Sequence, residues 1–154
     1  MEQGIAETLV RRAMAQAAIA ASRGDAPFGA VLATPDGVVL LEAANAQATR
    51  ADPTAHAEIA LIRAAARELR RPVLDGLVVA SNAESCSMCA SALIKARVAT
   101  IVFGAPHEGH VDPAIALAEL VARSRHRPAL VGPTLAAACA AQIAAARVAT
   151  PAPD

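Results

Sequence analysis

The spacing of apolar positions divides the first third of the chain into one helix and two strands. Apolar side chains recur at helical spacing over residues 5–22, and Gly24 follows them as a typical helix stop. Two apolar runs, at 28–33 and 38–43, then flank a Thr-Pro-Asp-Gly segment at 34–37. Proline presets the backbone of a tight turn and glycine tolerates a positive φ, so this part of the sequence predicts a β-hairpin.

Beyond the hairpin, helical and strand patterns alternate to the end of the chain. A polar loop over 45–54 comes first. The expected elements that follow it are a helix at 56–70, a strand at 77–80, a helix at 86–96, a strand at 98–103, a helix at 113–122, a strand at 129–131 and a helix at 134–146. Such alternation is typical of an α/β protein with a largely parallel sheet flanked by helices, to which the hairpin adds an antiparallel pair.

Composition supports one folded domain. The chain has 154 residues, of which 55% are hydrophobic and 18% charged. That length suits a single hydrophobic core, and that composition excludes a disordered chain. We therefore expect one domain over 1–150, followed by a frayed, proline-containing tail at 151–154.

Charge and cysteine content indicate which kinds of binding partner and which cellular compartment to expect. The 14 basic and 14 acidic residues cancel, so there is no global positive field to attract phosphates, and nucleic acid is disfavoured as a partner. The apolar stretch after Arg11 and Arg12 is dominated by alanine and too weak for an export signal or a membrane anchor. Three cysteines are too few for a disulfide framework. These features predict a cytoplasmic protein.

Two short motifs each open a predicted helix. His56-Ala57-Glu58 begins one of them, and Cys86 and Cys89 lie at the start of another. Residues three apart lie on one face of a helix, so the two sulfurs can bind the same ion, with His56 as a third ligand. Three protein ligands leave the fourth tetrahedral position to water, which distinguishes a catalytic zinc from a closed structural one. A dithiol redox pair is the alternative interpretation of the C-x-x-C spacing.

Glu58 offers a carboxylate beside this predicted metal. It follows His56 by two positions, which is about 200° around a helix, so the two side chains cannot bind one ion from the same face. From the end of the helix, however, the carboxylate can reach a substrate in front of the metal and transfer protons. The alternative is a solvated acid that the helix dipole favours in a first turn.

These motifs resemble the zinc-dependent cytidine deaminase-like superfamily, and in particular its branch of guanine deaminases, cytosine deaminases and tRNA adenosine deaminases. That superfamily carries H-x-E followed by P-C-x-x-C, and the resemblance here extends over residues 26–104. It implies a three-layer α/β/α fold with a five-stranded mixed sheet, and a homodimer. It also implies a Zn²⁺ cofactor held by His56, Cys86 and Cys89, with Glu58 as the proton shuttle.

The resemblance implies substrate contacts as well. The amide of Asn45 would hold the substrate ring, the backbone N–H of Ala57 would reach the base, and Phe28 would line the pocket. Asn45 also suits a turn at a strand exit, and Phe28 also suits a plain core position. Ser85 departs from the family, which usually has proline before the first cysteine. This departure affects the rigidity of a turn whose carbonyl, in relatives, receives the scissile amino group.

The sequence after Gly104 carries fewer signals. His107, His110 and Asp112 imitate a metal-binding cluster, but they fall in a predicted loop, so a place at the pocket rim or in solvent is favoured over a second metal. Cys139 lies on an alanine-rich helix, where we expect it to be packed in the core.

Together these features predict a hydrolytic deaminase that releases ammonia from a free nucleobase or nucleoside, with guanine or cytosine first. Zero net charge, with Arg147 as the only basic residue near the last helix, disfavours a long anionic ligand. A tRNA adenosine deaminase fits the core motif equally well. A non-catalytic zinc-binding interaction module is a further alternative, against which the intact Glu58 argues.

Overall fold

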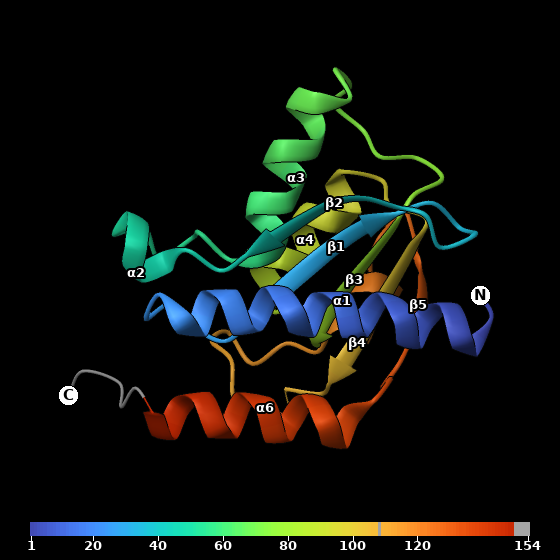
Figure 1. The fold of residues 1–154 in the computed structure, drawn as a ribbon. Helices are drawn as coiled ribbons and strands as arrows, with labels where there is room; N and C mark the ends of the chain where they lie inside the picture. Colours follow the sequence, from blue (N-terminus) through green and yellow to red (C-terminus); the bar gives the residue numbers. More distant parts are fainter. Residues whose placement is uncertain (108, 150–154) are drawn as a thin grey trace.

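A five-stranded mixed sheet forms the centre of the computed structural model, which describes residues 1–107 and 109–149 (Figure 1). The strand order is β2-β1-β3-β4-β5. The strands are β1 Gly29–Ala33, β2 Val39–Ala44, β3 Val78–Ala83, β4 Thr100–Ala105 and β5 Ala129–Val131. β1 is antiparallel to both β2 and β3, whereas β3, β4 and β5 run parallel.

Helices cover both faces of this sheet. They are α1 Gln3–Ser22, α2 Gln47–Arg50, α3 Ala57–Glu68, α4 Ser87–Lys95, α5 Leu117–Ala122 and α6 Ala136–Ala149. One core cluster joins α3, α4 and α5 to one face, and a second joins α1 and α6 to the other, where the two helices lie side by side (Figure 1). The α/β/α order of layers is therefore confirmed.

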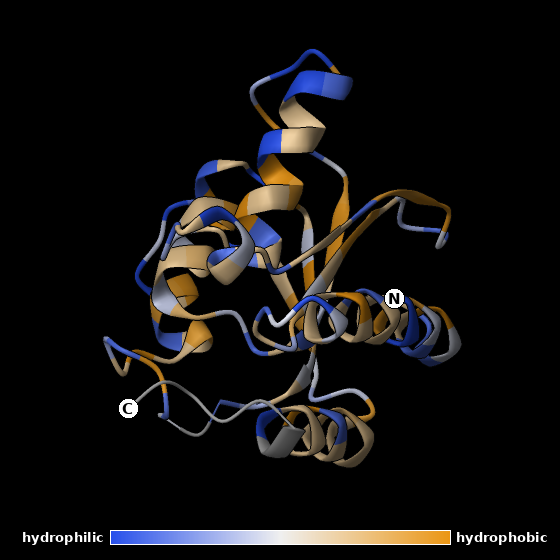
Figure 2. Cartoon of the chain, turned by 60° about the vertical axis from the view of Figure 1, so that its left-hand side comes forward, coloured by the Kyte–Doolittle hydropathy of each residue, from blue (hydrophilic) through white to orange (hydrophobic). Residues whose placement is uncertain are grey.

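The apolar pattern of the strands explains these two cores. Successive strand residues point to opposite faces, so that Leu32 joins the cluster under α3 and α4 while Val31 joins the cluster under α1. Apolar colour accordingly gathers in the sheet and on the inner sides of the helices, and the far end of α3 is polar (Figure 2). None of the described helices has the length and apolar character needed to span a bilayer.

Most predicted elements are present, and the differences have local causes. The sheet is half parallel rather than largely parallel, because β1 lies between β2 and β3 and is antiparallel to each. β3 continues to Ala83, beyond the predicted end at 80, because its polar residues Ser81 and Asn82 are buried rather than exposed. The polar loop over 45–54 contains the short helix α2. The predicted frayed tail at 151–154 lies outside the described residues.

The helix predicted at 113–122 begins only at Leu117. The N–H of Leu117 donates to the carboxylate of Glu84, 3.0 Å away. A side chain from a distant part of the chain thus satisfies one of the first N–H groups of this helix, and no local sequence signal marks this start.

β1 approaches α1 so closely that one position in the contact has to be glycine. A Cβ atom added at Gly29 would overlap the carbonyl oxygen of Ala13 and lie 2.6 Å from the backbone nitrogen of Ala17. Neither backbone atom can move without displacing the helix. This close contact sets the position of β1 and of the residues just before it.

We expect Gly29→Ala to lower the free energy of unfolding by about 1–3 kcal/mol, because the added methyl group pushes α1 away from the sheet. The measurement is urea-induced unfolding. Gly4→Ala is the matched control, because a Cβ atom there meets nothing within 4 Å, and alanine in a helix is neutral or up to about 1 kcal/mol stabilising. Equal stability of the two variants would contradict this account of the contact.

Candidate active site

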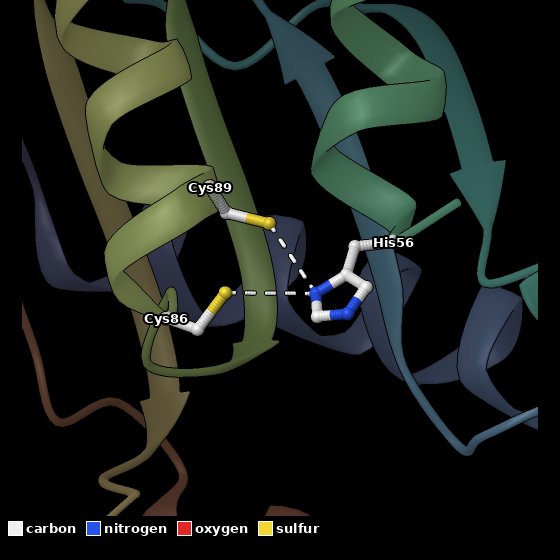
Figure 3. Close-up of side chains that lie close together, drawn as sticks. All are labelled: His56, Cys86 and Cys89. Atoms are coloured by element: carbon white, nitrogen blue, oxygen red, sulfur yellow. Dashed lines mark hydrogen bonds between the residues drawn. The ribbon is translucent and has the colours of Figure 1, made fainter. Parts of the chain in front are cut away.

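Two helix N-termini bring the predicted metal ligands together. His56 is the residue that precedes α3, and Cys86 is the residue that precedes α4. Nδ1 of His56 lies 3.6 Å from Sγ of Cys86 and 3.5 Å from Sγ of Cys89, as Figure 3 shows. Neither helix start is capped by the side chain of that preceding residue, so first-turn N–H groups and the positive ends of both helix dipoles remain directed toward this site.

The spacing of these three atoms fits a zinc ion. Zn–S bonds of about 2.3 Å and Zn–N bonds of about 2.0–2.1 Å at a tetrahedral angle place the nitrogen and each sulfur about 3.6 Å apart. The distances between Nδ1 and the two sulfurs have this value, and all three ligand atoms lie within 4.8 Å of one another. His56, Cys86 and Cys89 therefore form a potential zinc site with one tetrahedral position left for solvent.

The two thiols depend on each other electrostatically. The Cys89 thiol, as a hydrogen-bond donor, lowers the pKa of Cys86 to about 4, and His56 adds to this effect while burial opposes it. The same interaction with Cys86, together with burial, raises the pKa of Cys89. One thiolate thus forms readily and the second does not. A divalent cation between the two sulfurs removes this conflict, because it stabilises both thiolates.

The carboxylate of Glu58 is buried beside this triad, only 6% of the residue being exposed. Burial raises the pKa of Glu58, and a hydrogen bond that the Ser85 hydroxyl donates to Oε1 at 2.9 Å opposes the increase. The side chain that replaces the usual family proline thus contacts the candidate proton shuttle directly. The solvated first-turn acid, the alternative interpretation of Glu58, is wrong.

A cavity of about 280 Å³ opens in front of these groups. From the part of the chain that carries the motifs, its lining includes Phe28, Asn45, His56, Glu58 and Cys86. Ala57 and Ser85 are buried and are not part of the lining. The predicted contacts of all four residues with a substrate stay predictions, and Phe28 and Asn45 are the two of them that line the cavity.

Asn45 lines the cavity and also forms a turn. Its Oδ1 accepts a hydrogen bond from the backbone N–H of Gln47 at 3.0 Å, and its Nδ2 donates to Oε1 of Gln47 at 2.8 Å. The carbonyl oxygen of Asn45 accepts a hydrogen bond from Arg23, which in turn pairs with Asp25. Asp25 also accepts two hydrogen bonds from Thr49. This network, centred on the buried carboxylate of Asp25, fixes the loop on which Asn45 lies.

Several pocket residues carry no recognisable signal in the sequence. Asn82 is fully buried, its Nδ2 donates to the carbonyl oxygen of Pro27, and its Oδ1 accepts from the N–H of Gly29, both at 3.0 Å. It thereby holds the turn that carries Phe28. Only its position near the end of a strand suggests a role in the pocket, because its hydrogen-bond partners are 53 and 55 residues away in the sequence.

The last third of the chain completes the pocket. Its contributions come from the segment after β4 and from α6, namely Pro106, His107, His110, Val111, Ala140, Ile143, Ala144 and Arg147. Within the described residues, His56, Cys86 and Cys89 are the one cluster spaced for a metal, and His107 and His110 do not form a second one with Asp112. Cys139 is buried in the core, as expected.

Comparisons with known proteins agree with this site. Residues 4–105 match the family model of the cytidine and deoxycytidylate deaminase zinc-binding region. The chain is 37% identical to guanine deaminase of Bacillus subtilis over 102 residues, which is 66% of this chain and 65% of that protein. It is 33% identical to the tRNA-specific adenosine deaminase of Aquifex aeolicus over 104 residues, covering 68% of each.

A solved structure of a deaminase is also similar to this chain. It comes from a study of A-to-I editing by tRNA:A34 deaminases at the wobble position of transfer RNA, and it superposes with a TM-score of 0.71 and 32% identity over 79% of this chain and 93% of that one. The matched region spans a small part of three longer relatives, as little as 8% in one case.

The fold and site define a zinc-binding α/β protein with an open metal position. The chain belongs to the cytidine and deoxycytidylate deaminase family of zinc-binding proteins.

We expect Cys86→Ala and Cys89→Ala each to reduce bound zinc from about one ion per chain to well below it, because two of the protein's ligands cannot hold the ion as three do. Elemental analysis of the purified protein measures this directly. Cys139→Ala is the matched control and should keep its zinc, since this cysteine is packed between α6 and the sheet. Full zinc content in Cys86→Ala would refute the ligand assignment.

Proposed function

We propose that this protein is a hydrolytic deaminase of a free nucleobase or nucleoside, with guanine or cytosine as the first candidates. The observation that carries the proposal is the buried carboxylate of Glu58 beside a three-ligand zinc site at the bottom of one cavity. A purely structural zinc site needs neither an open position nor an acid. The family to which the chain belongs supports the same reaction type.

The reaction replaces an exocyclic amino group by oxygen, with water consumed and ammonia released. Zinc, when bound by His56, Cys86 and Cys89, would supply an activated water at its open position. Glu58 takes a proton from that water and delivers it to the adjacent ring nitrogen while the water oxygen bonds to the carbon that carries the amino group. Glu58 then moves the remaining hydroxyl proton to the amino group, and the C–N bond breaks to release ammonia. The raised pKa of Glu58 suits a group that holds a proton between these two transfers.

Ser85 and Asn45 have supporting roles in this proposal. The Ser85 hydroxyl fixes the orientation of the Glu58 carboxylate by its hydrogen bond to Oε1. Asn45 lines the cavity on a loop that Arg23 and Asp25 hold in place, and beyond its hydrogen bonds with Gln47 its amide keeps one N–H and one oxygen lone pair for the ring. Phe28 adds an apolar surface on which a flat ring can stack.

Cavity size and charge favour a small, uncharged ligand. A volume of about 280 Å³ is at the lower end of the range for small-molecule sites, roughly 300–1,000 Å³. Among the described lining residues, Arg147 is the one arginine or lysine. A long polyanion would require more positive groups around the entrance. The likeness to a guanine deaminase agrees with this choice.

A tRNA adenosine deaminase is the second candidate. The likeness to the Aquifex aeolicus enzyme and to the tRNA:A34 deaminase structure favours it. Such an enzyme would accept a single flipped base in the same cavity while the rest of the RNA lies outside. The zinc triad and Glu58 would act identically, so the two candidates differ in what surrounds the base and not in the chemistry.

We expect Glu58→Gln to keep zinc and the fold but to lower the rate of ammonia release by at least about 10²-fold, because the amide cannot transfer the protons. Zinc content, circular dichroism and an ammonia assay are the measurements. Glu68→Gln, an exposed position on the same helix, is the matched control and should retain full activity. Turnover of Glu58→Gln near the wild-type rate would contradict the mechanism.

Substrate choice can be tested by ammonia release from guanine, cytosine, adenine, their nucleosides and an anticodon stem-loop RNA. We expect a free base or nucleoside to have a kcat/KM at least about tenfold above that of the RNA, a difference of about 1.4 kcal/mol in transition-state binding. Deamination of the RNA alone, with tight and salt-sensitive binding, would select the tRNA candidate. Stoichiometric zinc without any ammonia release would favour the non-catalytic module.

A further inference from the structure

The segment over residues 106–116 forms one side of the cavity but has little structure of its own. It connects β4 to α5, contains no helix or strand among its described residues, and contributes Pro106, His107, His110 and Val111 to the lining. It also lies just beyond the region that matches the family model. Something outside the segment must therefore hold it at the cavity.

Glu84 provides this support at both ends of the segment. At the far end, its Oε1 accepts a hydrogen bond from the N–H of Leu117 at 3.0 Å. At the near end, its Oε2 accepts one from the N–H of His107 at 3.4 Å, and Nε2 of His107 lies 3.4 Å from Oε1. One carboxylate thus spans the start and the end of a loop of about ten residues.

Both the backbone of Glu84 and its hydrogen-bond partner Leu117 are held in place by the fold. The backbone N–H of Glu84 donates to the carbonyl oxygen of Ala105 at 2.7 Å, which ties it to the end of β4. Leu117 is only 1% exposed and packs in the core under α3, α4 and α5. The side chain of Glu84 is 13% exposed, so water competes weakly for its oxygens. Hydrogen bonds to a charged acceptor are stronger than neutral ones.

Glu84 itself lines the cavity, and it belongs to the turn that carries Ser85 and Cys86. It immediately precedes Ser85, which contacts Glu58, and Cys86, a zinc ligand. A shift of the 106–116 segment relative to this turn would change the shape of the cavity while leaving the zinc triad intact.

We propose that Glu84 is a positioning residue that sets substrate affinity and selectivity by holding the 106–116 segment against the catalytic turn. It does so through the backbone N–H groups of His107 and Leu117. It takes no part in the proton transfers. The affinity part of this proposal rests on the proposed function, whereas the structural part does not.

The experiment compares Glu84→Gln and Glu84→Ala with wild type. Glutamine keeps the shape but offers only one acceptor oxygen for the two N–H groups, and alanine offers none. Residue-resolved hydrogen exchange should show the amides of His107 and Leu117 protected in the wild type. Exchange at one of them should rise by at least about tenfold in the Gln variant, and at both in the Ala variant, equivalent to about 1.4 kcal/mol each.

Steady-state kinetics supply the functional readout. We expect KM to rise by about tenfold in Glu84→Ala with kcat changed less than about twofold, because uniform binding is lost and the chemical step is kept. The ratio of kcat/KM between guanine and cytosine should change as well. Zinc content should stay at the wild-type level. Glu119→Gln is the matched control, because the exposed carboxylate of this acid on α5 pairs with Arg123, and only its backbone N–H, which the substitution keeps, bonds to the segment at Ala116.

Each outcome has one meaning. Unprotected amides at His107 and Leu117 in the wild type overturn the proposal even if the variants do not fold. Protected amides in the variants, with an increase in KM, show that Glu84 contacts the substrate itself and also overturn it. A loss of kcat or of zinc without a change in KM overturns it in favour of a role in the chemistry. Increased exchange in the variants without turnover of any substrate by the wild type supports the structural part and rejects the proposed function.

Discussion

Charge compensation between two sulfurs and one divalent cation is the interaction on which the site depends. Cys86 and Cys89 lie within one helical turn and cannot both ionise at low cost without a cation between them. His56 reaches the same point from another helix, 30 residues earlier in the sequence. Bringing the starts of α3 and α4 this close requires β1 and β3 to be adjacent, which makes the mixed sheet a condition for the metal site.

The close contact between α1 and β1 also helps to position one side of the cavity. Gly29 lets β1 approach the helix, and Asn82 at the end of β3 holds the turn just before it through two buried hydrogen bonds. Phe28 lies between these two constraints. Packing and hydrogen bonding therefore place an apolar surface in the cavity that His56 and Cys86 also line.

Local patterns predicted most elements and the metal site, because helical periodicity, turn residues and helix starts each depend on residues that are close together in the sequence. His56 and Cys86 could be predicted since each marks a helix start, and Glu58 followed from its distance to His56. Asn82, Asp25 and Glu84 could not, because the partners in these hydrogen bonds lie 23–55 residues away and nothing in a local pattern identifies them. The late start of α5 has the same cause, since a distant carboxylate accepts the first N–H of that helix.

The zinc-site residues and much of the remaining cavity lining come from different parts of the chain. The zinc triad, Glu58, Phe28 and Asn45 all lie within the family region at residues 4–105, and all of them except Cys89 line the cavity. The opposite side of the cavity comes from the 106–116 segment and α6, which lie outside that region. Guanine and tRNA adenosine deaminases resemble this chain to a similar degree, with 37% and 33% identity over about the same length. Glu84 holds the 106–116 segment against the family region through hydrogen bonds to His107 and Leu117, and Gln142 of α6 donates one to the carbonyl oxygen of Met14. Under our proposal, selectivity depends on how the first of these contacts holds the segment.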